Sequence, residues 1–158
     1  MTNLLNQIDA RYGRSAFFQT RICASFADGE ECEVAGNAAK LSGSFDLRDN
    51  NYQFDGEGLY CNEDLLVTYN YSCGVVGVGK SLSIYSPSGD FLYALRPSGN
   101  LFSCRFTLSV GDTKVCEISR PYFFGMRFRA QISDDCPAGL ALFCLWVAMT
   151  RMVSTGNG

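Results

Sequence analysis

Hydrophobic and polar residues alternate along most of this chain. In residues 102–110, for example, every second side chain is apolar and those between are polar. A period of two is typical of a β-strand with one buried face. Short turns rich in Gly, Asp, Asn and Pro separate the alternating segments, which predicts an antiparallel meander of ten or more strands. The clearest predicted strands are 16–24, 41–48, 65–71, 81–85, 90–95, 102–110, 114–119 and 124–132.

One stretch near the C-terminus breaks this alternation. Residues 136–149 carry no charge, and their large apolar side chains point to every side of a helix. Such a helix must be buried in protein or in lipid. Fourteen helical residues reach roughly 21 Å, short of the ~30 Å hydrocarbon layer of a bilayer. We therefore predict a helix over 135–152 inside this domain, with Asp134 or Asp135 capping its start.

Strands with one apolar face and a helix without a polar face fit together if the sheet closes around the helix. Closure removes the exposed edges of the sheet, and the helix fills a barrel too wide for side chains alone. We therefore predict a mainly β domain, a closed antiparallel β-barrel around a central hydrophobic C-terminal α-helix. The expected organisation is an N-terminal lead-in over 1–15, the barrel domain over 16–153 and a flexible tail over 154–158.

Composition and charge narrow the functions open to such a domain. A length of 158 residues suits one domain. The net charge of −3 and the pI near 4.9 give no general attraction to nucleic acid. The first residues lack the basic and apolar regions of a signal peptide, so we expect a cytoplasmic protein, without a transmembrane segment.

The eight cysteines are expected to be reduced and mostly part of the core. The chain has no histidine and no C-x-x-C pair, which disfavours a metal site. Without histidine, no thiol has its usual activating base. We therefore predict that the protein is not an enzyme and uses no metal or other cofactor.

The string GVVGVGKS at 74–81 satisfies the nucleotide-binding pattern G-x-x-x-x-G-K-[ST]. In a P-loop, Gly74 and Gly79 would shape the turn, Lys80 would reach the terminal phosphates and Ser81 would bind Mg²⁺. That geometry needs a helix beginning near Lys80, whose N-terminus supplies the phosphate-binding N–H groups. The residues after Ser81 instead alternate like a strand and reach a turn, which favours a Gly-rich loop between two strands.

Three arginines form a candidate anion site. Arg105, Arg127 and Arg129 fall on the predicted outward faces of late strands. Guanidinium groups bind phosphate and carboxylate through paired hydrogen bonds, so these residues suit an anionic headgroup, a peptide or a phosphate. Solvated arginines paired with Glu117 or Asp112 explain the same pattern.

The second half of the chain resembles the tubby C-terminal-like superfamily, which includes LURP-one-related proteins and phospholipid scramblases. The resemblance covers about residues 65–153 and lies in the segments 80–96, 103–120 and 128–152. In the last of these, a strand runs through an acidic turn into the hydrophobic helix. It implies a barrel of about twelve strands around one helix. The chain has no match for the lysine and arginine pair of the phosphoinositide-binding tubby members.

These observations favour a non-enzymatic binding or scaffolding module of the tubby-like type. Its expected partner is an anionic phospholipid, in peripheral association with a membrane, or another protein; nucleic acid is not expected. Two alternatives remain: a nucleotide-binding protein that uses the string at 74–81, and a lipocalin-like carrier of a small ligand with the helix outside. A helix outside the barrel would need a polar face, which this one lacks.

Overall fold

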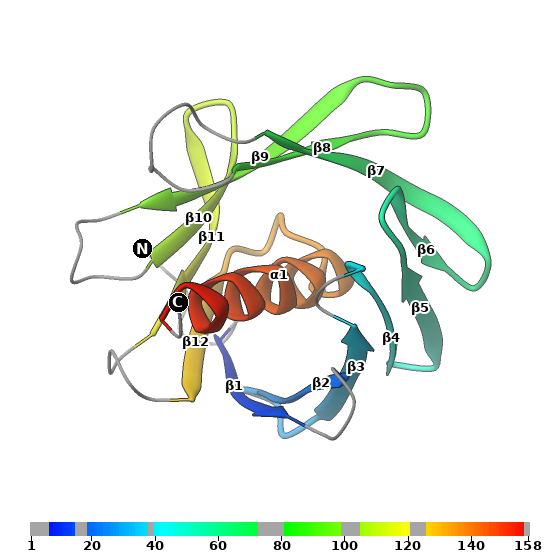
Figure 1. Cartoon of the computed structure of the whole chain (residues 1–158). Coiled ribbons are helices and arrows are strands. Elements are labelled where there is room, and N and C mark those ends of the chain that lie inside the picture. The colour runs from blue at the N-terminus through cyan, green and yellow to red at the C-terminus, as the bar shows by residue number, and fades with distance from the viewer. Residues whose placement is uncertain are drawn as a thin grey trace.

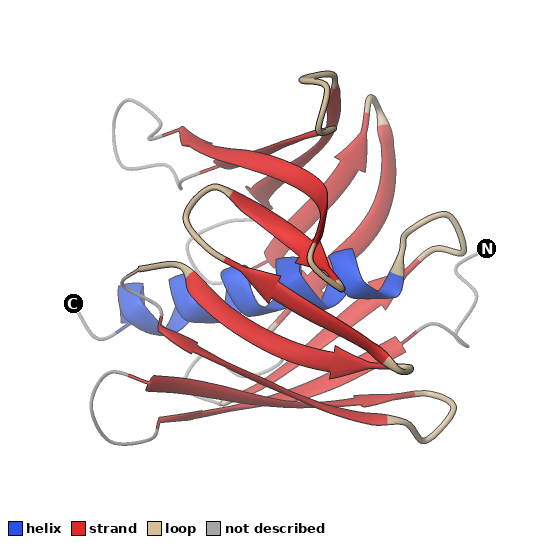
Figure 2. Cartoon of the chain, turned by 90° about the vertical axis from the view of Figure 1, so that its right-hand side faces the viewer, coloured by secondary structure: helices blue, strands red, loops and turns tan. Residues whose placement is uncertain are grey.

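The computed structural model describes residues 7–14, 19–37, 40–72, 81–98, 105–120 and 126–156. These residues form twelve strands and one helix, and the strands close into a single barrel around the helix (Figures 1 and 2). The predicted fold class is confirmed. The elements are β1 (Gln7–Arg14), β2 (Gln19–Phe26), β3 (Glu31–Asn37), β4 (Ser42–Leu47), β5 (Asn50–Phe54), β6 (Gly58–Cys61), β7 (Asp64–Ser72), β8 (Ser81–Tyr85), β9 (Phe91–Ser98), β10 (Arg105–Val110), β11 (Thr113–Ser119), β12 (Arg127–Ile132) and α1 (Ala138–Gly156).

Each strand pairs antiparallel with the next one along the chain, and β1 also pairs with β12. Residues 7–14 are therefore a strand of the barrel, where the sequence predicted a lead-in over 1–15. In β1, Ile8, Ala10 and Tyr12 are buried, while Asp9 and Arg11 face solvent. Without β1, the edges of β2 and β12 would both lack hydrogen-bond partners.

The helix begins at Ala138 rather than at 135 and ends at Gly156 rather than at 152, so it includes part of the predicted tail. Asp134 and Asp135, the predicted caps, lie before the helix in a turn closed by the Cys136 amide, which donates to the Ser133 carbonyl at 3.1 Å. The Pro137 carbonyl accepts the first helical bond from the Ala141 amide at 3.0 Å. Pro137 is thus the capping residue, and its fixed φ holds the chain's entry into the helix.

The helix lies inside the barrel, as its all-round apolar pattern predicted. From Ala141 to Met149 no side chain is more than 1% exposed. Phe54 of β5 packs against the rings of Trp146 and Phe143, with ring centres 4.8 and 5.2 Å apart. Full burial contributes about 1.5–3 kcal/mol for each large apolar side chain, so the helix and the inward side chains of the strands together stabilise the core.

Four thiols are buried in the described part of the core, Cys32 of β3 and three others on or near the helix. Among the described residues no cysteine forms a disulfide, and Cys116 on β11, Cys136 before the helix and Cys144 on the helix are buried. Burial raises the pKa of the Cys136 thiol to about 12 and raises the pKa values of Cys116 and Cys144 as well. All three therefore stay protonated at neutral pH and pack as small apolar groups.

The raised pKa values predict a loss of stability at high pH. In the unfolded chain each thiol ionises near its ordinary pKa of 9.0, whereas in the folded protein Cys136 keeps its proton up to about pH 12. The thiol contribution to the free energy of unfolding is therefore constant below pH 9 and falls as pH rises towards 12. The expected slope is about 1.4 kcal/mol per pH unit for each thiol.

Urea unfolding in reductant, at about pH 8 and about pH 10, measures this slope. Cys144→Ala should remove one thiol's share of it, whatever the variant's stability at neutral pH. If Cys144→Ala had the same slope as the parent protein, the Cys144 thiol would not have a raised pKa in the folded state.

Candidate functional site

The three predicted arginines share the outer wall of the barrel. Arg105 on β10 and Arg129 on β12 both lie in register with Ser119 of β11. They are therefore two strand spacings apart, or roughly 10 Å. Arg127 lies two residues before Arg129 on the same exposed face of β12. The predicted patch is a single surface, although its members are not in mutual contact range.

Closure of the barrel brings a fourth arginine to this surface. Arg11 of β1 lies directly opposite Arg127 of β12, and Cys23 of β2 lies opposite Arg11 on its other side. Facing positions in an antiparallel pair place their Cβ atoms about 4.5–5.5 Å apart, so the two positive side chains repel each other. Among the described residues neither Arg11 nor Arg127 has an ion-pair partner. We call this pair the arginine site.

The neighbouring arginines are neutralised. Arg129 Nε lies 3.1 Å from a carboxylate oxygen of Asp9, and Arg105 lies 3.8 Å from Glu117. The predicted alternative of an arginine paired with Glu117 therefore holds for Arg105. Exposed ion pairs are worth at most about 1 kcal/mol, so Arg105 and Arg129 can give up these carboxylates for another anion. The positive charge that no carboxylate compensates is at Arg11 and Arg127.

Sequence analysis missed Arg11 because it left residues 1–15 out of the sheet. The signal was present, since Ile8, Ala10 and Tyr12 alternate with polar residues. The arginine site can hold an anion between two guanidinium groups, each of which donates paired hydrogen bonds. Its position on two hydrogen-bonded strands keeps the two side chains on one face.

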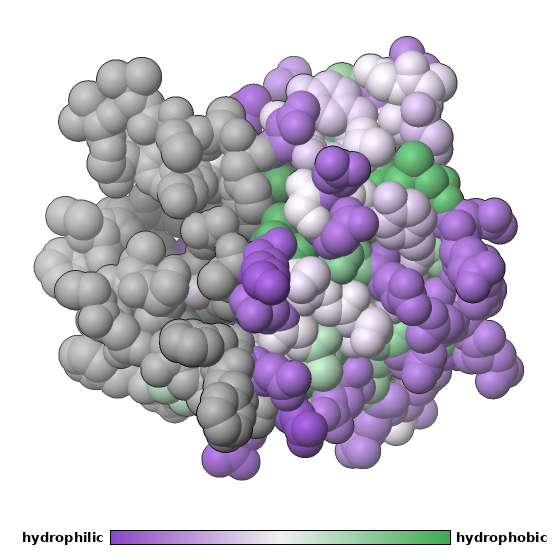
Figure 3. All heavy atoms as spheres, turned by 45° about the vertical axis from the view of Figure 1, so that its right-hand side comes forward, coloured by the Kyte–Doolittle hydropathy of each residue, from purple (hydrophilic) through white to green (hydrophobic). Residues whose placement is uncertain are grey.

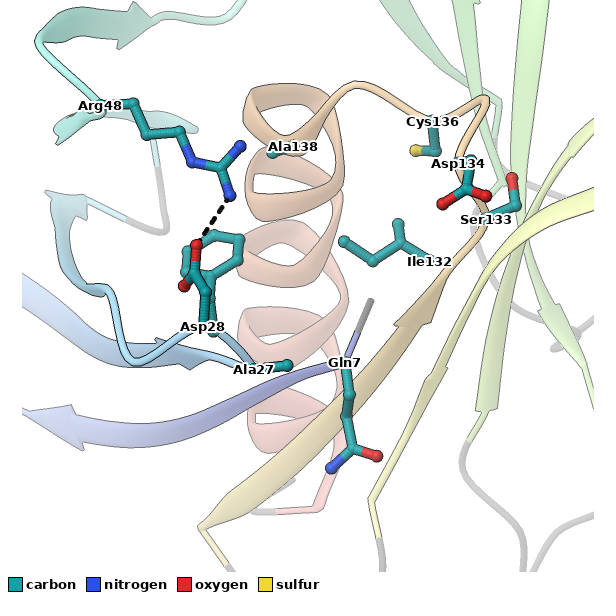
Figure 4. A pocket seen from close by; sticks show the side chains of 10 residues that line it. Gln7, Ala27, Asp28, Arg48, Ile132, Ser133, Asp134, Cys136 and Ala138 are labelled. Carbon is teal, nitrogen blue, oxygen red and sulfur yellow. Dashed lines mark hydrogen bonds and ion pairs between the residues drawn. The ribbon is translucent and has the colours of Figure 1, made fainter. Parts of the chain in front are cut away.

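A second candidate is a hollow at the end of the barrel where α1 begins (Figure 4). It encloses about 440 Å³, and Asp134 and the Asp28–Arg48 ion pair border it. Arg48 also bonds Glu30 at 2.9 Å, and this hydrogen bond raises the pKa of the guanidinium. Arg48 thus already binds two carboxylates, and Asp134 adds another carboxylate to the lining of the hollow. The hollow does not suit an anionic ligand. Its lining residues are Gln7, Phe26, Ala27, Asp28, Arg48, Ile132, Ser133, Asp134, Cys136 and Ala138.

Only one of the four residues of the nucleotide-binding alternative lies in the described part of the chain. Gly74, Gly79 and Lys80 lie outside the described residues. Ser81 is the first residue of β8 and pairs with Ser72 of β7. The expected strand after Ser81 is confirmed, and no helix N-terminus, which a P-loop needs, follows it.

Two other features are absent from the described residues. In this part of the chain, no group of three or more Cys, Asp or Glu residues could hold a metal ion. No helix in it has both the length and the apolar character that crossing a bilayer requires.

No protein-family model, no curated protein and no solved structure matches this chain. Function must therefore be argued from the surface of the barrel itself.

Proposed function

We propose that this protein is a non-enzymatic binding module whose arginine site holds the phosphate of an anionic phospholipid headgroup. The observation that carries the proposal is the Arg11–Arg127 pair, two facing cations without a carboxylate partner among the described residues. A bound phosphate would remove their mutual repulsion and accept hydrogen bonds from both.

The position of Met126 fits contact with a membrane surface. Met126 directly precedes Arg127 and is 42% exposed. Its carbonyl accepts a hydrogen bond from the Tyr12 amide at 2.8 Å, which fixes it beside the β1–β12 pair. An apolar side chain next to two arginines can enter the interfacial layer while the guanidinium groups stay at the phosphates. The proposed location is the cytoplasmic surface of a membrane.

We further infer that the chain is a tubby-like protein, related to LURP-one-related proteins and scramblases. This inference rests on the resemblance of residues 65–153 and on the architecture, a closed barrel of twelve strands with one buried C-terminal helix. The arginine site would then be this chain's own anion-binding surface, because the lysine and arginine pair of the phosphoinositide-binding members is missing.

Sedimentation with vesicles tests the proposal. The protein should bind vesicles of phosphatidylcholine and phosphatidylserine, but not vesicles of phosphatidylcholine alone. Each basic residue near an anionic surface contributes about 1 kcal/mol, so Arg11→Gln with Arg127→Gln should weaken binding by about tenfold or more. High salt should weaken binding of the parent protein.

The matched control removes the same charge elsewhere. Lys40→Gln with Arg96→Gln, at exposed residues of the turn before β4 and of β9, lies away from β1 and β12 and should lower affinity by less than about twofold, through net charge alone. Equal losses in the two double variants, or no binding by the parent protein, would refute the arginine site.

A further inference from the structure

A different surface carries exposed apolar side chains on the opposite wall of the barrel. In the ring of strands β7 lies six places from β1, so the wall of β7 to β9 faces away from the arginine site. Leu66 on β7 is 41% exposed, Phe91 on β9 is 53% exposed, and Tyr85 on β8 lies half-buried between them. We call these three residues the Phe91 face. Figure 3 looks towards the side of β5 to β7 and shows hydrophobic atoms at the surface among hydrophilic ones.

The register of the strands joins these side chains into one patch. Tyr85 lies opposite Phe91 on one side and Thr68 on the other. The rings of Tyr85 and Phe91 meet edge to face, with centres 5.8 Å apart. Leu66 is two residues before Thr68, and both are exposed more than the buried Val67 between them, so Leu66 lies on the same outer side, diagonally next to Tyr85.

The hairpin that presents Phe91 is braced. The Ser86 hydroxyl accepts from the Asp90 amide at 3.1 Å, and the Ser88 hydroxyl donates to the Asp90 carboxylate at 3.1 Å. The Ser86 amide also donates to the Asp90 carbonyl at 2.8 Å. A partner would therefore meet a preorganised surface and would lose little affinity to ordering it.

The surroundings of the patch are acidic. From Asp55 to Arg96 the chain has five acidic residues and two basic ones: Lys80, which is outside the described part, and Arg96, five residues along β9 from Phe91. Asp64 lies two residues before Leu66, and Asp90 directly precedes Phe91. Neither carboxylate forms an ion pair with a described residue. This charge disfavours an anionic membrane and favours a cationic partner.

We propose that the Phe91 face is a docking surface for a segment of another protein that carries Lys or Arg beside apolar side chains. The apolar residues of the segment would cover Leu66, Tyr85 and Phe91, and its cations would meet Asp64 and Asp90. Exposed aromatic and aliphatic residues with a charged rim are typical of such interfaces. This surface is separate from the proposed headgroup site, so either can fail without the other.

Selection of peptides tests the docking surface directly. A displayed library of random peptides is selected on the full-length protein and counter-selected on the Leu66→Ser, Phe91→Ser double variant. The selected peptides should be rich in Lys or Arg together with Leu, Ile or aromatic residues. No enrichment, or enrichment of neutral or acidic peptides, would overturn the proposal.

The affinity of the best labelled peptide for variants of the protein, measured by fluorescence anisotropy, shows where the peptide binds. Loss of the two anchors in Leu66→Ser, Phe91→Ser should weaken binding at least about tenfold. Met126→Ser, at an exposed methionine just before β12 and away from this face, should change it less than about twofold. If the double variant and Met126→Ser weakened peptide binding equally, the Phe91 face would not be the docking surface.

Charge variants test the proposed partner chemistry. Asp64→Asn with Asp90→Asn should weaken peptide binding several-fold and reduce its salt dependence, whereas Glu31→Gln with Asp49→Asn should not. Melting curves check that each variant is folded, as the exposure of these side chains predicts. Self-association of the protein that depends on Leu66 and Phe91 would assign the face to a second copy instead and overturn the proposal.

Discussion

Replacement of Leu145 by Asp should prevent the domain from folding. Leu145 is 0% exposed at the middle of α1, and the barrel surrounds the helix on every side. Loss of a buried leucine side chain alone costs about 2–5 kcal/mol. A carboxyl group without a hydrogen-bond partner in this interior adds several kcal/mol more, even if it stays protonated. Together these costs approach or exceed the about 5–15 kcal/mol that stabilise a typical domain.

The expected result is insoluble protein, or soluble protein without a cooperative melting transition by circular dichroism. Leu66→Asp is the matched control, because the same substitution at a leucine on the outer wall buries no charge. It should melt within a few degrees of the parent protein. Normal solubility and melting of Leu145→Asp would show that the helix is not the interior of the barrel.

Gly43→Ala should be strongly destabilising, because an added methyl group there would meet both a neighbouring strand and the core. Gly43 of β4 lies opposite Gly36 of β3. A Cβ atom at Gly43 would lie 2.6 Å from the Ala35 carbonyl oxygen and 2.5 Å from the Phe54 ring. The backbone atom cannot move without parting the strands, and Phe54 cannot move without disturbing Trp146. We expect a loss of about 3 kcal/mol in the free energy of unfolding.

Gly13→Ala provides the comparison. Gly13 is an exposed residue of β1, and an added Cβ would have only the Arg21 carbonyl oxygen near it, at 3.8 Å. This variant should be neutral, or slightly more stable because alanine has less conformational freedom to lose. Urea unfolding of both variants measures the difference, and similar stabilities would contradict close strand packing at Gly43.

The alternation of residues predicted which side of each strand faces inward, but not how deep each position lies in the barrel. The alternation in 102–110 and 124–132 puts Val110 and Met126 on the apolar, inward side of their strands, yet they are 43% and 42% exposed. Val110 is the last residue of β10, and Met126 lies just before β12. At a barrel end an inward side chain has no layer above it, so it stays open to water. Depth depends on where neighbouring strands end, which one strand's pattern does not contain.

The arginine site, too, could be predicted only in part from the sequence. The outward position of Arg105, Arg127 and Arg129 follows from their own strands. That Glu117 and Asp9 neutralise two of them, while Arg127 meets Arg11, depends on the register between β1, β12 and β11. Residues 11 and 127 are at opposite ends of the chain, so no local pattern relates them.

The local period of apolar residues was enough to predict an antiparallel sheet with one apolar face and a helix buried on all sides. The tertiary structure alone decided that β1 closes the ring, that the helix begins at Ala138, and which charges remain without a partner. The physical reason is that side-chain period acts within one element. Strand register, ion pairing and solvent exposure instead arise between elements that the folded barrel brings together.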